Sequence, residues 1–328
     1  MQVFDRIPTE PPRPEGAVVT IGAYDGVHLG HRTVLAAVAR EAARRGLASV
    51  VVTFEPHPAE VVRPDSAPRL LTDLDQKLEL LATTGIDATV VVPFDAERAN
   101  EEAEHFVRTV LVAALAARLV VVGEDFHFGH LRQGNVAMLS ELGAECDFEV
   151  IGHHLVAADG SNARDELQVS STAIRRALAE GRLDDASAML GRPHEMRGPV
   201  VSGDRRGRTI GFPTANVAVS QRMLMPDDGI YAGWMVRRHD TDADTAPEVL
   251  PAAIYIGKRP TFHADQPASL LEVHCLAFDG DLYGESVAVR LTHHIRGDRR
   301  FDGAGALAEQ LGRDCDEARR LLRTVDAN

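Results

Sequence analysis

Two histidines stand three residues apart in the stretch IGAYDGVHLGH at positions 21–31, and a long helical pattern follows them. Residues three apart on a helix lie on one face, so the imidazoles of His28 and His31 can point at the same ligand. A neutral imidazole donates one hydrogen bond, and a protonated imidazole adds a positive charge. Both properties suit a phosphate group on which negative charge develops during a displacement at phosphorus.

Glycines and an aspartate surround the two histidines, at Gly22, Asp25, Gly26 and Gly30. Glycine lets the backbone approach a ligand closely. The stretch lies where the first predicted strand ends and a helix begins, which is where open parallel sheets bind ligands and where free N–H groups attract phosphate. We therefore expect these residues to form a nucleotide site. A histidine pair at a helix cap, with glycines that serve only the turn, is the alternative.

A second candidate for phosphate binding is VSSTAIRRAL at 169–178. Hydroxyl residues suit the N-terminus of a helix, and their side chains and backbone amides can also receive phosphate. An arginine one turn later can form paired hydrogen bonds with a triphosphate. The residues in question are Ser170, Ser171, Thr172 and Arg175. An ordinary helix cap followed by a solvated arginine explains the same pattern.

A third candidate is GPVVSGDRRGRTIGFPTANV at 198–217, where glycine recurs every fourth residue, at Gly203, Gly207 and Gly211. A glycine-rich loop can surround a phosphate chain with backbone N–H groups. Pro213 stiffens the turn that follows, and Thr214 and Asn216 project to the same side of an extended chain. A hydroxyl and an amide oxygen are hard ligands that suit Mg²⁺. A glycine-rich β-turn with an asparagine cap is the alternative.

The elements that must position these groups differ between the two halves of the chain. In the first half, strand patterns at 17–26, 48–56, 88–94, 118–126 and 147–154 alternate with helix patterns at 29–46, 73–85, 97–117 and 135–143. This alternation predicts βαβ units and a parallel sheet, and the VVVTF run is typical of a strand buried on both faces. The second half contains short strand patterns and turn signals, which predict antiparallel β structure, and a helix at 303–325 ends it.

Length and composition agree with a two-domain α/β protein. The 328 residues carry a net charge of −14, which disfavours nucleic acid as a partner. The sequence shows no signal peptide pattern and no apolar run long enough to span a bilayer. Its three cysteines fit a reducing compartment, so we expect a cytoplasmic protein with no membrane partner. We place the domain boundary between residues 186 and 187, giving domains 1–186 and 187–328.

Three motifs in the first half resemble the nucleotidylyltransferase family: H-x-G-H at 28–31, the loop GEDFHFG at 123–129 and S-S-T-x-I-R at 170–175. Their order resembles the FMN adenylyltransferase module of bacterial riboflavin biosynthesis enzymes. The resemblance implies a Rossmann-like domain in which the histidines meet the α-phosphate of ATP and Asp25 and Asp125 lie near the nucleotide. Ala23 and Tyr24 stand where this family often has Asn and Phe. Ala23 has no polar side-chain atom, so the hydrogen bond that an asparagine could make near ATP is absent.

The second half resembles riboflavin kinases. The string G-R-x-x-G-F-P-T-A-N at 207–216 matches their signature, and IGKRPTF at 256–262 and LEVHCLAFDGDLYG at 271–284 match two further segments. The resemblance implies a β-barrel kinase domain in which Glu272 is the base. Strand alternation places Glu272 and His274 on one face, although an isolated strand glutamate is usually solvated. We expect His274 to be structural.

Together, the resemblances imply a bifunctional enzyme. The barrel domain would convert riboflavin and ATP to FMN, and the first domain would convert FMN and ATP to FAD and pyrophosphate, both with Mg²⁺. We expect small-molecule partners and a monomer or weak homo-oligomer. Three alternatives stay open: a chain that retains only the kinase activity, another nucleotidylyltransferase joined to an unrelated β domain, and a flavin-binding regulator without catalysis.

Overall fold

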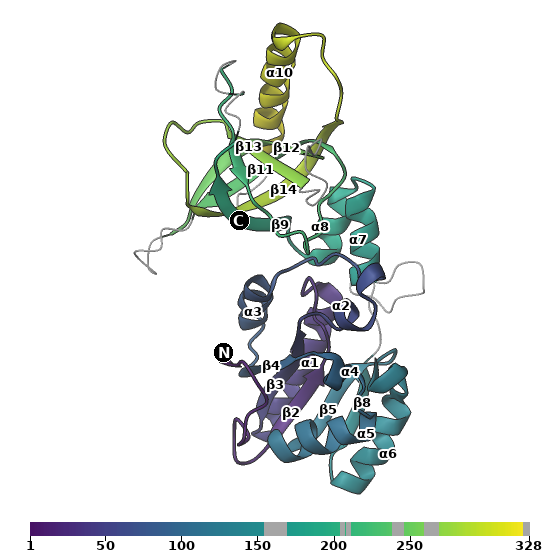
Figure 1. The fold of residues 1–328 in the computed structure, drawn as a ribbon. Helices are drawn as coiled ribbons and strands as arrows, with labels where there is room; N and C mark the ends of the chain where they lie inside the picture. Colours follow the sequence, from purple (N-terminus) through teal and green to yellow (C-terminus); the bar gives the residue numbers. More distant parts are fainter. Residues whose placement is uncertain (154–168, 204–206, 208–210, 238–245, 259–268, 324–328) are drawn as a thin grey trace. The chain divides into compact units, whose positions relative to one another are not determined.

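The computed structural model describes the whole chain except residues 154–168, 204–206, 208–210, 238–245, 259–268 and 324–328 (Figure 1). Contacts divide the chain into two compact units, Met1–Ser171 and Thr172–Asn328. The boundary that the sequence places after residue 186 lies later in the chain and stays a prediction. Among the helices of the described ranges, none combines the length and apolar character that crossing a bilayer demands.

The first unit is built on a six-stranded parallel sheet. Its strands are β1 (Gln2–Phe4), β2 (Ala17–Ile21), β3 (Ala48–Glu55), β4 (Ala88–Pro93), β5 (Ala117–Gly123) and β8 (Glu149–His153). They pair in the order β1-β4-β3-β2-β5-β8. From β2, the chain first extends the sheet on one side with β3 and β4, and it then returns to the other side of β2 with β5. The ends of β2 and β5 therefore form the switch point at which such sheets bind ligands.

Helices cover both faces of this sheet (Figure 1). One apolar cluster joins alternate sheet residues such as Val18 and Val51 to α1 (Leu29–Arg45) and α3 (Leu74–Ala82). The opposite cluster joins residues such as Val19 and Val52 to α5 (Ala103–Phe106), η2 (Val107–Ala114) and α6 (Val136–Cys146). Successive side chains of a strand face opposite ways, so both faces of each central strand are buried. The predicted parallel α/β domain is confirmed.

The predicted single helix over 97–117 is wrong. The chain instead forms α4 (Ala96–Ala99), a break, α5 and the π-helical η2. The break has a local cause, because the side-chain amide of Asn100 donates to the carbonyl of Ala96 at 2.7 Å and ends the first turn. Five short elements complete the unit: α2 (Pro58–Val62), η1 (Pro64–Ser66), β6 (His127–Phe128), η3 (His130–Arg132) and β7 (Gly134–Asn135).

The second unit is a closed antiparallel barrel. The unit begins within α7 (Ser171–Ala179), which α8 (Leu183–Leu190) follows. The barrel strands are β9 (His194–Val201), β10 (Ala215–Val217), β11 (Gly229–Arg237), β12 (Glu248–Lys258), β13 (Ser269–Cys275) and β14 (Ser286–Gly297), in the closed order β10-β13-β12-β11-β14-β9. The predicted barrel is confirmed, and closure removes exposed sheet edges.

The predicted terminal helix is present as α10 (Ala304–Leu322), and it packs against the barrel. Its buried residues include Cys315 and Ala318, which contact barrel residues of β11 and β12. A largely buried ion pair joins the two parts, with the Arg296 guanidinium 2.6 Å from the Asp314 carboxylate. Burying Cys315 also raises the pKa of its thiol to about 11.

Candidate active sites

The turn after β2 brings the two predicted histidines together. His28 caps α1, and its Nδ1 accepts a hydrogen bond from the backbone N–H of His31 at 3.3 Å. The two rings stack with centroids 3.6 Å apart and planes inclined by 17°. A hydrogen-bonded cap and a stacked pair therefore hold both imidazoles at the N-terminus of the helix, where free N–H groups favour an anion.

His31 lies in an environment that keeps its ring neutral. Burial lowers the pKa of His31 well below its ordinary value, and the nearby His28 and Lys77 lower it further. Its Nδ1 atom is buried and has no hydrogen-bond partner among the described residues. A buried polar atom without a partner costs free energy, so this atom is suited to a hydrogen bond with a bound ligand.

Asp25 connects this turn to the segment before α3. Its carboxylate accepts hydrogen bonds from the backbone N–H of Leu71 at 2.9 Å and of Thr72 at 3.1 Å. The Thr72 hydroxyl in turn accepts from the backbone N–H of Gly26 at 3.0 Å. All of these groups are buried. These contacts thus give Asp25 a loop-fixing position, and its predicted proximity to ATP stays a prediction.

The structure accommodates Tyr24, which stands where the family often has phenylalanine. Its hydroxyl lies 2.6 Å from the Thr20 hydroxyl, so the extra polar atom relative to phenylalanine is satisfied inside the core. The ring packs 4.9 Å from the His31 ring, and burial raises the pKa of Tyr24, so the phenol stays neutral. Tyr24 and Val27 both have positive φ angles, 50° and 38°, which mark this turn as strained for side chains of their kind.

The serine motif reaches the histidine turn within the first unit. The Ser171 hydroxyl donates to the backbone carbonyl of Asp25 at 2.9 Å. A Cβ atom on Gly30 would lie 3.2 Å from the carbonyl of Val169, so glycine permits the close approach. Ser170 lies between Val169 and Ser171, the two residues that make these contacts. Two predicted motifs therefore meet, through a contact between residues 146 positions apart in sequence.

Four other predicted residues of this region lie just beyond β2, just beyond β5 and on α7. Thr172 and Arg175 belong to α7, on the far side of the division between the units. Gly22 continues from β2 and donates its N–H to the carbonyl of Val52 at 3.0 Å. Asp125 is exposed just beyond β5, and its backbone carbonyl accepts from the Nδ1 of His127 at 2.8 Å. Their predicted roles toward ATP stay predictions.

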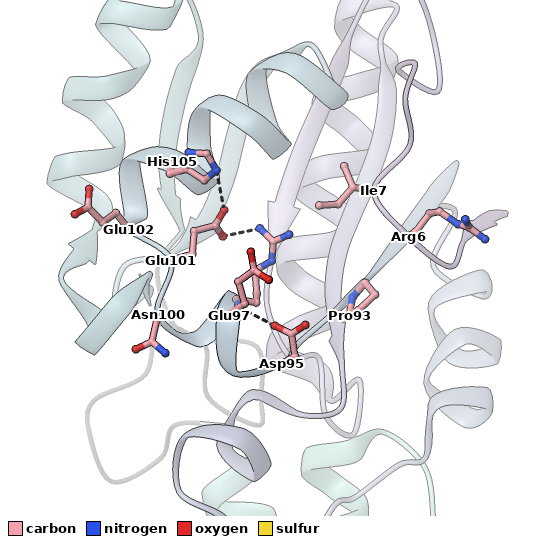
Figure 2. Close-up of a pocket in the computed structure, with 10 residues that line it drawn as sticks. Arg6, Ile7, Pro93, Asp95, Glu97, Asn100, Glu101, Glu102 and His105 are labelled. Carbon is pink, nitrogen blue, oxygen red and sulfur yellow. Dashed lines mark hydrogen bonds and ion pairs between the residues drawn. The ribbon is translucent and has the colours of Figure 1, made fainter.

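A cavity of about 850 Å³ opens near the carboxyl end of β4 (Figure 2). Carboxylates predominate in its lining, among them Asp95, Glu97, Glu101 and Glu102. Glu101 lies 2.6 Å from Arg98 and 3.6 Å from His105, and the second arginine of the lining, Arg6, pairs with Asp5. None of the predicted site residues lines this cavity, and its acidic lining disfavours phosphate.

The kinase motif residues assemble on two paired barrel strands. Asn216 on β10 lies directly opposite Glu272 on β13 in the antiparallel register. The Thr214 hydroxyl donates to the Glu272 carboxylate at 3.4 Å. A Cβ atom on Gly203 would overlap the side-chain amide of Asn216, so glycine is required for this packing. The structure thus brings Thr214, Asn216 and Glu272 to one place.

The turn that carries these residues is fixed by His274. Its Nδ1 donates to the carbonyl of Pro213 at 2.7 Å, and its ring meets Phe212 edge-on at 5.6 Å. Gly211 has a φ of 87°, which favours glycine. Residues 204–206 and 208–210, on either side of Gly207, and the loop 259–268 lie outside the described residues. The predicted phosphate loop therefore stays a prediction.

A second cavity, of about 540 Å³, lies beside Thr214 and Pro213. Phe278 and Tyr283 supply aromatic rings to its lining. The Arg237 guanidinium stacks on Phe278 at 4.9 Å and also pairs with Glu285, which fixes the ring orientation. A concave space with aromatic walls beside polar motif residues suits a nucleotide base.

Two residues near the sites escape motif reasoning: Lys77 and Tyr255. Lys77 is buried and lies close enough to His31 to lower the pKa of that ring. The one feature of the sequence that could have pointed to Lys77 is that the chain has just two lysines. Tyr255 lies opposite Glu272 on the neighbouring strand. Burial raises the pKa of Tyr255, and nearby acids, including Glu272, raise it further. Such neighbours appear only when the strand register is known.

The fold and the two sites define a protein that joins a Rossmann-like nucleotidylyltransferase domain to an antiparallel barrel domain. Comparison with known families agrees with this division. The family model described as FAD synthetase matches residues 10–173, and the family model described as riboflavin kinase matches residues 190–322.

Curated relatives match nearly the whole chain. The bifunctional riboflavin kinase/FMN adenylyltransferase of Escherichia coli (strain K12) is 39% identical over 300 residues, which is 92% of this chain and 91% of the relative. The protein of the same name from Listeria monocytogenes is 36% identical over 310 residues, which is 94% of this chain and 93% of that relative. The chain therefore belongs to the bifunctional riboflavin kinase/FMN adenylyltransferase family, as the motifs predict.

A solved structure shows the same fold. The crystal structure described as a macrolide-efflux protein from Streptococcus pneumoniae has a TM-score of 0.83 and 28% sequence identity, and the match covers 97% of this chain and 99% of that one. That description concerns the other protein. The likeness supports the two-unit architecture over the full length.

Proposed function

We propose that this chain makes FAD from riboflavin in two ATP-dependent steps. The second unit phosphorylates riboflavin to FMN, and the first unit transfers AMP from ATP to FMN and releases pyrophosphate. The observation that carries the proposal is the separate assembly of two motif sets, His28 with His31 in one unit and Thr214 with Glu272 in the other.

In the adenylyl transfer, an oxygen of the FMN phosphate attacks the α-phosphorus of ATP, and the bond to the pyrophosphate oxygen breaks. His28 and His31 donate hydrogen bonds to the α-phosphate as negative charge develops there. Ser170 and Ser171 hold the leaving phosphates, with Gly22, Gly26 and Gly30 allowing the backbone to approach. Both substrates supply the reacting atoms, so no covalent enzyme intermediate is required.

In the kinase reaction, the ribityl 5′-hydroxyl of riboflavin attacks the γ-phosphorus of ATP and ADP leaves. Glu272 takes the hydroxyl proton as the new P–O bond forms. The hydrogen bond from Thr214 holds the Glu272 carboxylate in one orientation before substrate binds. The adjoining cavity with Phe278 receives the nucleotide base.

Mg²⁺ accompanies ATP in this proposal. The described residues contain no group of three His, Cys, Asp or Glu side chains that could hold a metal ion. Mg²⁺ commonly keeps several waters and binds substrate phosphates, so few protein ligands are needed. Thr214 and Asn216 offer the oxygen donors that Mg²⁺ prefers, and the missing Cβ of Gly203 leaves room for Asn216 beside the turn. The ion neutralises phosphate charge when bound. We also infer a cytoplasmic monomer or weak homo-oligomer that binds neither nucleic acid nor membranes.

A product assay tests both halves. The chain is incubated with riboflavin, ATP and Mg²⁺, and FMN and FAD are separated chromatographically. We expect His28→Ala to abolish FAD formation while FMN still accumulates, and Glu272→Ala to abolish FMN formation while added FMN is still converted to FAD. The exposed residues His105 and Glu309 provide matched alanine controls. FMN without FAD from the unmodified chain would leave only the kinase, and no flavin product at all would refute the proposal.

A further inference from the structure

We propose that Lys77 is the cation that meets the phosphates of ATP in the first unit, and that His31 acts there as a neutral hydrogen-bonding imidazole. The proposal rests on the adenylyl transfer proposed above. It assigns a residue that none of the three motifs contains. The permanent charge of the site then comes from Lys77, and His31 contributes hydrogen bonding without a charge.

The position of Lys77 follows from the Asp25 contacts. The Asp25 carboxylate holds the backbone of Leu71 and Thr72, which directly precede the helix cap Asp73. Lys77 lies one turn into that helix, and its backbone N–H donates to the carbonyl of Asp73 at 3.0 Å. The loop contact therefore fixes the start of α3 against the histidine turn, and the Lys77 ammonium lies close enough to lower the pKa of His31.

The surroundings of His31 oppose a charge on its ring. The described groups that face it are the stacked His28 ring, the neutral phenol of Tyr24 and the Lys77 ammonium. A second positive charge next to an ammonium in a buried site is strongly disfavoured. The buried Nδ1 of His31 still has no described partner, so the ring can hydrogen-bond a ligand without being protonated.

The choice of lysine is itself informative in this chain. Of the 35 basic residues in the sequence, lysine accounts for Lys77 and Lys258 alone, and the rest are arginine. Lys77 is just 3% exposed. A compact ammonium with three donors fits where a planar guanidinium needs more room, and it can follow a phosphate oxygen as the geometry at phosphorus changes.

The test compares two substitutions in the full-length chain. Lys77→Met keeps the length of the side chain and removes the charge, whereas Lys77→Arg keeps the charge. We expect Lys77→Met to lower kcat for FAD formation by about 10²-fold, the usual effect of losing one donor to a developing charge, with a smaller change in KM for ATP. Lys77→Arg should retain more activity than Lys77→Met. The calorimetric transition of the first unit reports on its folding, and riboflavin phosphorylation by the second unit of the same molecules should change less than about twofold.

A second measurement uses the unmodified chain and so does not depend on a variant that folds. Above pH 7 phosphomonoesters are largely dianionic. With Lys77 as the cation, kcat/KM for FAD formation stays level from pH 7 to 8.5. A required imidazolium would make it fall about tenfold per pH unit, which would overturn the proposal. Full activity in Lys77→Met would overturn it as well. If the unmodified chain forms no FAD, the proposed function fails instead.

Discussion

Removing the Asp25 carboxylate should destabilise the first unit by several kcal/mol. In Asp25→Ala, the backbone N–H groups of Leu71 and Thr72 lose their acceptor, and both residues are at least 97% buried. A buried donor left without a partner costs about 1–3 kcal/mol, so the two together cost about 2–6 kcal/mol. The Thr72 hydroxyl adds little, because it lies 3.4 Å from the carboxylate.

Asp25→Asn is the matched control. A single oxygen, Oδ1, accepts from both amides, at 2.9 Å and 3.1 Å. The oxygen of an asparagine can take the same position, so both donors keep an acceptor. They lose the charge assistance, and the N–H of Leu71 also loses its second contact, to Oδ2 at 3.1 Å. We expect a cost of about 1 kcal/mol for this variant.

Scanning calorimetry of the full-length variants measures the difference. In a unit of this size, 1 kcal/mol shifts the midpoint by about 2–4 °C, so Asp25→Ala should lower the transition of the first unit by roughly 5 °C or more. The transition of the second unit serves as the internal reference. Equal midpoints for the two variants, with ATP binding lost in both, would refute the loop-fixing role and indicate that Asp25 contacts the nucleotide directly.

Two further predictions concern the second unit. Gly203→Ala should abolish FMN formation and spare FAD formation from added FMN, because its Cβ would overlap Asn216. Gly297→Ala is the control, since its Cβ meets nothing within 4 Å, and it should leave both activities intact. Similar losses in both variants would contradict this reasoning. Burial favours the protonated form of Glu195, but hydrogen bonds and charges from Arg290 and Arg197 outweigh it and lower the pKa. A lowered folded-state pKa gives stability that is present above the unfolded value of about 4.3 and is lost as pH falls below it. Urea midpoints between pH 6 and 3 should therefore fall more steeply in the natural chain than in Glu195→Gln, and parallel curves would count against the ion-pair account.

Local patterns in the sequence were sufficient for the kind and order of most elements. The helix over 29–46 was predicted from its periodicity and its terminal glycine, and the structure ends α1 at Gly46 in the left-handed conformation. The capping histidine and the turn before it are also local, because the contact between His28 and His31 spans three residues. Where a local side chain competes with the helix, as Asn100 does, periodicity alone predicted a continuous helix and was wrong.

What the sequence by itself determined were the motifs, the parallel and antiparallel halves and the family to which they point. Tertiary structure alone decided which distant groups meet: Asp25 with Leu71, 46 positions apart, Thr214 with Glu272, 58 positions apart, and Lys77 with His31. The physical reason is that periodicity and capping depend on neighbours along the chain, whereas the charge and hydrogen bonding of a site depend on strand register and helix placement. These are set by burial of apolar faces and are not written at any single position.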